Sequence, residues 1–214
     1  GRRMSDPERG ADRERRVGLI VNPVAGLGGR VGLKGSDGVA IQQRALELGA
    51  VPRALHRTIE ALARLRPIAG EFTFVTYPGE MGEEAARRSG FDPRVIGSIV
   101  PAKTTASDTR AAACEMRRLG VELLLFAGGD GTARDVSDAV GRGLAVLGIP
   151  VGVKIHSAVY AISPAVAGEL ARSFLEGKTQ GTHEAEVVDV NAAALRCGVV
   201  STVLHGVHRV PNDA

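Results

Sequence analysis

The chain has 214 residues, of which 44% are hydrophobic and 24% charged, a balance ordinary for a soluble globular protein with one sizeable domain. Aromatic residues make up 3% and Trp is missing, which argues against a surface that stacks the bases of single-stranded nucleic acid. No apolar run approaches the roughly 18 residues of a membrane span. We therefore expect neither nucleic acid nor a membrane as a partner. Cys114 and Cys197 do not make a disulfide framework, which indicates a reducing, cytoplasmic compartment.

The net charge of +3 is concentrated in residues 1–16, where six arginines stand against four acidic residues and leave a surplus of +2. This segment has no apolar core, so it is not a signal peptide. We predict a disordered basic tail over residues 1–16. A solvated tail is favoured over an arm that binds nucleic acid.

Residues 17–21 (Val-Gly-Leu-Ile-Val) predict a buried strand, which ends at Asn22-Pro23 because proline cannot continue a central strand. A glycine-rich loop follows over residues 25–38 and matches neither the dinucleotide fingerprint nor the P-loop. So much glycine indicates backbone packed close to a ligand, plausibly phosphates, although a plain surface loop is the alternative. The candidate ligand-binding residues here are Asn22, Gly26, Gly28, Gly29, Arg30, Lys34 and Asp37, with Ser36 beside them.

Strands and helices alternate from residue 17 to residue 177, which predicts an α/β domain with a doubly wound, mainly parallel sheet. Further strands are expected at residues 72–76, 94–100, 123–127 and 145–149. Helices are expected at residues 39–48, 52–65, 81–89, 104–119, 133–140 and 163–175. From residue 178 to residue 214 the pattern changes, because residues 184–190 and 199–210 alternate without crossover helices. We read this part as the beginning of a β-rich unit that is naturally short or has been cut.

The run Leu123–Ala127 is apolar on both faces and is followed by Gly128-Gly129-Asp130-Gly131-Thr132. The three glycines would let a ligand approach the backbone, and Thr132 would cap the next helix, whose N-terminus attracts anions. Asp130 could bind Mg²⁺ or accept a proton from an attacking hydroxyl. The alternative is an ordinary turn, but ligands of open α/β sheets lie beyond the carboxyl ends of strands.

Four further segments carry candidate ligand-binding residues, each with a structural alternative. Thr104, Thr105 and Asp108 open a helix after a strand, and they either face a second phosphate or simply cap the helix. Asp135, placed in the first turn of the next helix, would otherwise stabilise the helix dipole. Lys154 and His156 follow an apolar segment, where a buried histidine satisfied by the core is the alternative.

Three segments of the chain carry a resemblance to a known family: Val21–Arg30 with its extension Lys34–Gly38, Gly128–Val136, and Gly148–Ala158. Thr104–Thr109 adds to it. These segments resemble the NAD kinase and diacylglycerol kinase superfamily, and most of all its ATP-NAD kinase-like members, some of them associated with acetoin catabolism. The resemblance covers roughly residues 17 to 211. Arg134-Asp135 stands where superfamily members often carry Asn-Glu.

The resemblance implies an α/β nucleotide domain followed by a β-rich domain, with substrates between them. It implies phosphoryl transfer from ATP or polyphosphate, with Mg²⁺, to a small-molecule acceptor such as NAD, and it makes a homo-oligomer an expectation. By this analogy Asp130 is the central, catalytic acidic residue and the candidate ligand for Mg²⁺, Gly128, Gly129 and Thr132 line the phosphates, and Asn22 holds the first loop around the nucleotide. The alternatives are a nucleotide-binding regulatory or inactive module and a lipid kinase.

Overall fold

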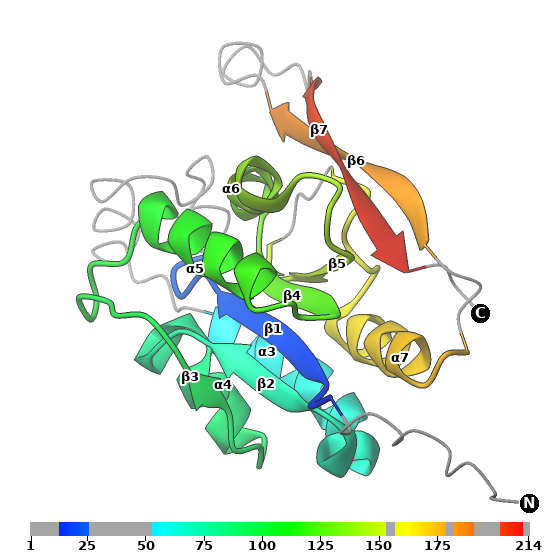
Figure 1. Ribbon diagram of the computed structural model, residues 1–214. Coiled ribbons are helices and arrows are strands. Elements are labelled where there is room, and N and C mark those ends of the chain that lie inside the picture. Colours follow the sequence, from blue (N-terminus) through cyan, green and yellow to red (C-terminus); the bar gives the residue numbers. More distant parts are fainter. Residues whose placement is uncertain (1–12, 26–52, 153–156, 179–181, 191–201, 212–214) are drawn as a thin grey trace, which may run out of the picture.

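A computed structural model of the chain describes residues 13–25, 53–152, 157–178, 182–190 and 202–211 (Figure 1). Five strands of this part form one sheet in the order β3-β2-β1-β4-β5, and every neighbouring pair is parallel. The strands are β1 (Arg16–Val21), β2 (Thr73–Thr76), β3 (Arg94–Val95), β4 (Leu123–Gly128) and β5 (Val146–Pro150). The predicted α/β fold with a mainly parallel sheet is confirmed.

The two central strands, β1 and β4, are apolar on both faces because both faces of the sheet are covered. Val21 lies opposite Ala127, and Ala127 lies opposite Ile149. The carboxyl ends of β1, β4 and β5 therefore stop at the same level of the sheet.

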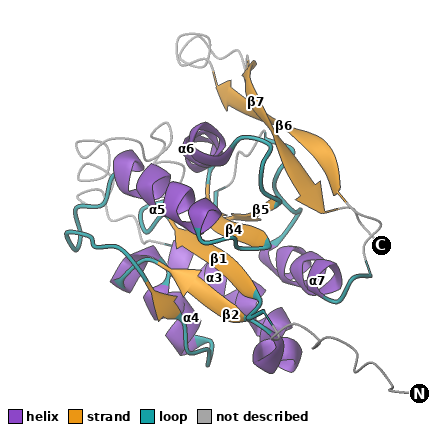
Figure 2. Cartoon of the chain, in the orientation of Figure 1, coloured by secondary structure: helices purple, strands orange, loops and turns teal. Residues whose placement is uncertain are grey.

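Helices cover both faces of the sheet (Figures 1 and 2). α5 (Ala106–Arg118) and α6 (Asp130–Val140) lie on one face. α3 (Ala54–Leu62), α4 (Glu83–Arg88) and α7 (Pro164–Leu175) lie on the other. Short 3-10 segments, η1 (Ala63–Glu71) and η2 (Gly79–Met81), follow α3 and precede α4. None of the helices in the described ranges combines the length and the apolar character that a bilayer crossing needs.

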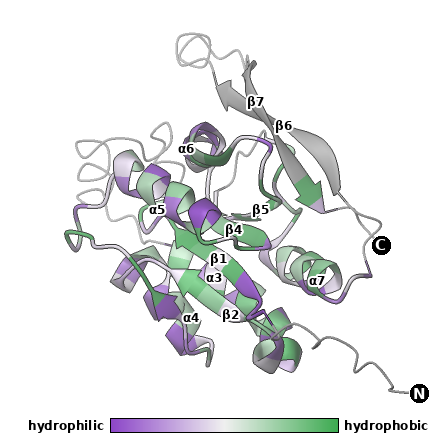
Figure 3. Cartoon of the chain, in the orientation of Figure 1, coloured by the Kyte–Doolittle hydropathy of each residue, from purple (hydrophilic) through white to green (hydrophobic). Residues whose placement is uncertain are grey.

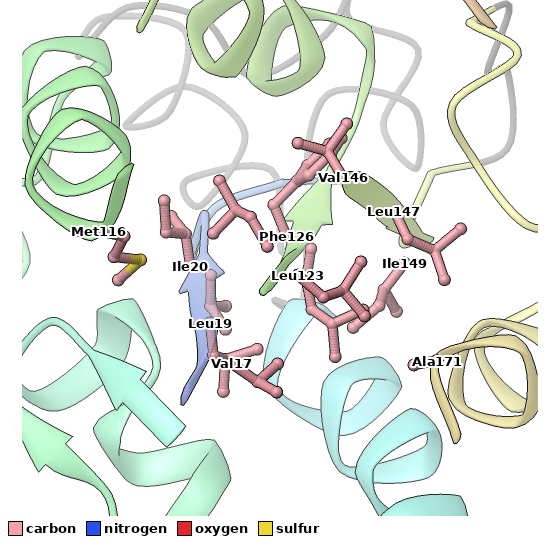
Figure 4. Close-up of a cluster of buried hydrophobic side chains, with 14 of the residues drawn as sticks. Val17, Leu19, Ile20, Met116, Leu123, Phe126, Val146, Leu147, Ile149 and Ala171 are labelled. Atoms are coloured by element: carbon pink, nitrogen blue, oxygen red, sulfur yellow. The ribbon is translucent and has the colours of Figure 1, made fainter. Parts of the chain in front are cut away.

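The hydrophobic core lies between the sheet and its two helix layers. The buried residues of α3, α5, α6 and α7 are mostly apolar, and Figure 3 shows the strands β1 and β4 between them in hydrophobic colours. Side chains of β1, β4 and β5 meet Met116 of α5 on one side and Ala171 of α7 on the other (Figure 4). Leu19, Leu123 and Phe126 are fully buried in this cluster. A core continuous through the sheet holds the strand ends in place.

The strand order reverses at the middle of the sheet. From β1 the chain moves outward to β2 and β3, and it then returns to β4 on the other side of β1. The carboxyl ends of β1 and β4 thus flank a topological switch point, where ligands of open α/β sheets bind. This point lies directly beyond Val21 and Gly128.

The C-terminal part forms an antiparallel pair, β6 (Thr182–Val190) and β7 (Thr202–Pro211), with a register shift between Val187 and Val188. The pair lies against α6, outside the helix layer (Figure 1). Val210 reaches the core. Both alternating segments therefore contain a strand, while their assignment to a separate β-rich unit stays a prediction.

Several boundaries differ from the sequence-based expectation. β1 begins at Arg16, and the guanidinium of Arg15 pairs with Glu122 at 2.9 Å, so the sheet starts inside the predicted tail. The strand expected at residues 94–100 forms ladder pairs at Arg94 and Val95 alone, because it is the edge of the sheet and has β2 as its one neighbour. α3 ends at Leu62, before the segment that contains Pro67. The helix predicted at residues 39–48 lies outside the described residues.

Candidate functional site

Asn22 ties the carboxyl ends of β1 and β4 together at the switch point. Its backbone N–H donates to the Ala127 carbonyl oxygen at 2.9 Å. Its side-chain Nδ2 donates to Thr132 Oγ1 at 3.1 Å, and its Oδ1 accepts the Val24 N–H at 3.3 Å. The end of β1 and the first turn of α6 are therefore linked by a side chain as well as by the sheet.

Gly128, which ends β4, and Gly129, which follows it, have different roles. A Cβ atom on Gly128 would lie 2.2 Å from Thr132 Oγ1, so a residue without a side chain is needed for Thr132 to approach the strand end. A Cβ atom on Gly129 would meet no atom within 4 Å among the described residues. Close approach of a ligand to the backbone at Gly129 stays a prediction.

α6 begins earlier than expected, and this changes the role of Thr132. The helix starts at Asp130 with Gly129 as its N-cap, and Thr132 is its third residue. The prediction that Thr132 caps the helix is wrong, because its hydroxyl accepts the Asn22 amide and sits against Gly128. The first hydrogen bond of the helix runs from the Ala133 N–H to the Gly129 carbonyl at 3.0 Å. The amides of Asp130, Gly131 and Thr132 precede it, and such amides form the anion-binding end of a helix.

The carboxylate of Asp130 lies at this helix end and is positioned by a second segment of the chain. Its Oδ1 accepts the backbone N–H of Ser157 at 2.9 Å. Ser157 is buried and follows β5. In the part of the chain that the structure describes, no three His, Cys, Asp or Glu side chains cluster into a metal site.

Tyr160 is a site residue that the sequence analysis missed. Its hydroxyl donates to the carbonyl oxygen of Gly129. Its ring packs edge-on against Phe126 of β4, with ring centroids 5.4 Å apart. Burial, and then the negative charge of Asp130, raise the pKa of the Tyr160 hydroxyl well above 10, so it is a neutral donor at physiological pH. No periodicity marks residues 157–162, so nothing in the sequence showed that this tyrosine returns to the central loop.

The start of α5 lies beside the start of α6. Arg110 Nη1 donates to Asp135 Oδ1 at 2.8 Å, and Cys114 Sγ lies 3.7 Å from the Ala139 carbonyl oxygen. Both contacts join residues 25 positions apart, so the two helices pack together and run in the same direction along this contact.

At the α5 start, Asp108 accepts the Thr105 N–H at 2.8 Å, so the predicted capping is confirmed. Thr104 is buried just before it. The structure thus brings both predicted phosphate-facing helix starts to one edge of the sheet, while the phosphate role of Thr104, Thr105 and Asp108 stays a prediction.

Asp135 is placed differently from the expectation. It lies in the second turn of α6, because the helix begins at Asp130, and its side chain is buried against α5. Its carboxylate pairs with Arg110. The helix-dipole interpretation for a first-turn Asp135 is therefore wrong, and the pair with Arg110 links the two helices instead.

The remaining candidates lie outside the described residues: Gly26, Gly28, Gly29, Arg30, Lys34, Asp37, Lys154 and His156.

The chain is similar to one known protein family and to a known protein structure. The model of the ATP-NAD kinase N-terminal domain family matches residues 17–179. A crystal structure of a Bacillus anthracis (strain Sterne) protein assigned as a diacylglycerol kinase shares 17% sequence identity, with a TM-score of 0.41. That match covers 85% of this chain and 47% of the other, so this chain spans about half the length of that protein. No curated protein matches this chain.

Proposed function

Because the chain belongs to the ATP-NAD kinase N-terminal domain family, we propose that it is a phosphotransferase that moves a phosphoryl group to a hydroxyl of a small molecule. The proposed donor is ATP or polyphosphate with Mg²⁺, and the favoured acceptor is NAD or a related dinucleotide. Membership of the acetoin-associated group and a homo-oligomer are further proposals that rest on the resemblance. A cytoplasmic location is also a proposal, and the free thiol of Cys114 supports it.

One observation carries the proposal: Asp130 stands at the N-terminus of α6, at the switch point of the sheet, with its carboxylate oriented by Ser157. The amides that precede the first helical hydrogen bond supply positive potential, and a Cβ atom on Gly129 would meet no described atom within 4 Å. A phosphate group bound there would lie next to a carboxylate whose direction is already set.

Phosphoryl transfer needs little covalent chemistry from a protein, because positioning and charge neutralisation supply most of the rate. The amides at the start of α6 would bind phosphate oxygens, and Asn22 would keep the end of β1 beside them. Asp130 would hold Mg²⁺, which neutralises phosphate charge when bound, or would accept the proton of the attacking hydroxyl. Both roles require the carboxylate to be ionised and fixed in direction.

The experiment is a transfer assay with Mg-ATP or polyphosphate and a panel of hydroxyl acceptors that includes NAD. Asp130→Asn keeps the size of the side chain but removes its charge, and we expect turnover to fall by about 10² to 10⁴-fold. Asp138→Asn is the matched control, since Asp138 is an exposed carboxylate on the same helix. It should keep wild-type turnover.

Unchanged turnover in Asp130→Asn would contradict the role of Asp130. Nucleotide binding without product for any acceptor would favour the alternative, a regulatory or inactive binding module. Transfer that requires a lipid acceptor would move the proposal to a lipid kinase.

A further inference from the structure

The position of Tyr160 is fixed by its contacts with Gly148 of β5 and with Phe126 of β4. A Cβ atom on Gly148 of β5 would lie 2.3 Å from the Tyr160 ring, so a glycine is needed there for the ring to lie against the strand. The backbone around Tyr160 pairs with the same residue, since the Gly148 N–H donates to Val159 O at 3.0 Å and the Ala161 N–H donates to Gly148 O at 3.2 Å. Both bonds and the contact with Phe126 set the direction of the Tyr160 hydroxyl.

The acceptor of this hydroxyl is a carbonyl that already has a partner. Gly129 O receives the first helical hydrogen bond from Ala133, so Tyr160 is not needed to satisfy it. The extra bond instead fixes the plane of the peptide that joins Gly129 to Asp130. Because a trans peptide is planar, its N–H points away from its carbonyl, and fixing one end fixes the other. A hydrogen bond to a carbonyl also polarises the amide and makes its N–H a stronger donor.

The segment after β5 that contains Ser157 and Tyr160 makes two contacts that orient Asp130. The Ser157 N–H holds the Asp130 carboxylate, and the Tyr160 hydroxyl holds the peptide before it. The side chain and the backbone of Asp130 are therefore both oriented by residues that follow β5.

We propose that Tyr160 is a positioning residue of this site, whose hydroxyl holds the Gly129–Asp130 peptide in the orientation that binds a phosphate group. This inference rests on the proposed function, because the phosphate group bound by this peptide is the group that the proposed reaction transfers. Tyr160 touches neither substrate nor reacting atoms and acts through Gly129 and Asp130.

The chain offers a matched control and a built-in probe. It has two tyrosines and no tryptophan, and the second tyrosine, Tyr77, is buried, with its hydroxyl 3.3 Å from Glu115 Oε2. In Tyr77→Phe, the tyrosine bands of the absorbance and fluorescence spectra come from Tyr160 alone. In Tyr160→Phe, they come from Tyr77 alone.

We expect Tyr160→Phe to keep the ring contacts and the fold but to lower kcat by about 10-fold, less than the ~10²-fold that a 1 Å misplacement can cost. The KM for the acceptor should stay unchanged, and tripolyphosphate with Mg²⁺ should bind several-fold more weakly. Tripolyphosphate should alter the tyrosine spectrum of Tyr77→Phe and leave that of Tyr160→Phe unaltered. Tyr77→Phe should keep the wild-type kcat.

The outcomes separate the two proposals. Wild-type kcat in Tyr160→Phe, with transfer in the wild type, overturns the role of Tyr160 and leaves the kinase proposal standing. Absence of transfer in the wild type, with a tripolyphosphate response that depends on Tyr160, overturns the kinase proposal and supports Tyr160. If the wild type shows neither transfer nor a response to tripolyphosphate, both the kinase proposal and the role of Tyr160 are overturned. If Tyr160→Phe does not fold, the spectrum of Tyr77→Phe decides, and no response to tripolyphosphate there overturns the inference.

Discussion

Asn22 shows at the scale of one residue how the site is assembled. Its side-chain amide joins Val24 on its own loop to Thr132 on α6. We expect the variants Asn22→Ala and Thr132→Val to show a coupling free energy of about 0.5–1.5 kcal/mol in a double-mutant cycle measured by urea unfolding, since each removes the same hydrogen bond. Effects that add to within about 0.3 kcal/mol would mean that the bond contributes nothing to stability.

Glu83 gives a prediction of pH dependence. Its carboxylate accepts the Gly79 N–H at 3.0 Å and pairs with Arg87 at 3.0 Å, and these two contacts, the first the larger, hold its pKa below the ordinary 4.5. A carboxyl group with a lowered folded-state pKa stabilises the fold above its unfolded pKa and loses that contribution as the pH falls through the folded value.

We therefore expect Glu83→Gln to lower the free energy of unfolding by about 0.5–1 kcal/mol at pH 7. The difference from the wild type should shrink as the pH falls below 4.5. Unfolding by urea at pH 7 and at pH 3 measures it. Glu84→Gln, which breaks an exposed pair with Arg88, is the control and should have the smaller effect. A difference of equal size at both pH values would count against this explanation.

At the scale of elements, the contact of α7 with α3 depends on Gly168. A Cβ atom there would lie 2.1 Å from the Ala61 carbonyl oxygen, which belongs to the backbone of α3 and cannot turn aside. Gly168→Ala should therefore force the helices apart and cost about 1–3 kcal/mol in thermal or urea unfolding. Gly70→Ala is the control, since a Cβ atom on Gly70 would meet nothing within 4 Å among the described residues, and it should change stability by less than about 0.5 kcal/mol. Equal effects of the two substitutions would exclude a close helix contact.

At the scale of the whole molecule, ligand binding should appear as stabilisation of the entire sheet, because the site joins its two halves. A ligand that binds the folded chain alone, at about 100 times its Kd, adds roughly 2.7 kcal/mol. For a chain of this size that is a rise in the unfolding midpoint of about 5–10 °C. We expect such a rise with Mg-ATP and its loss in Asp130→Ala, measured by thermal unfolding. A rise that persists in Asp130→Ala would place the nucleotide away from Gly128–Thr132.

The central strands were predictable because their residues are apolar without alternation, which suits a parallel sheet covered on both sides. The length of β3 was overestimated because Ile96, Ile99 and Val100 give the segment the apolar composition of a buried strand. At the edge of the sheet, however, the segment has β2 as its single neighbour, and it pairs at Arg94 and Val95 alone. The start of α6 was misplaced because Thr132 is a good capping residue by type. The Thr132 hydroxyl instead accepts a hydrogen bond from Asn22, just after β1. The local sequence around Thr132 does not predict this contact, because Asn22 lies 110 positions away in the chain.

The sequence by itself determined the alternation of strands and helices, the buried central strand and the glycine-rich turn with Asp130 at its end. Those features depend on local composition and periodicity, which residues close in the chain set among themselves. The tertiary structure alone decided which strand ends meet, that Ser157 and Tyr160 return to hold Asp130 and Gly129, and that Arg110 claims Asp135. These contacts join residues 25 to 31 positions apart, and they arise from the order of strands in the sheet, which no local pattern encodes.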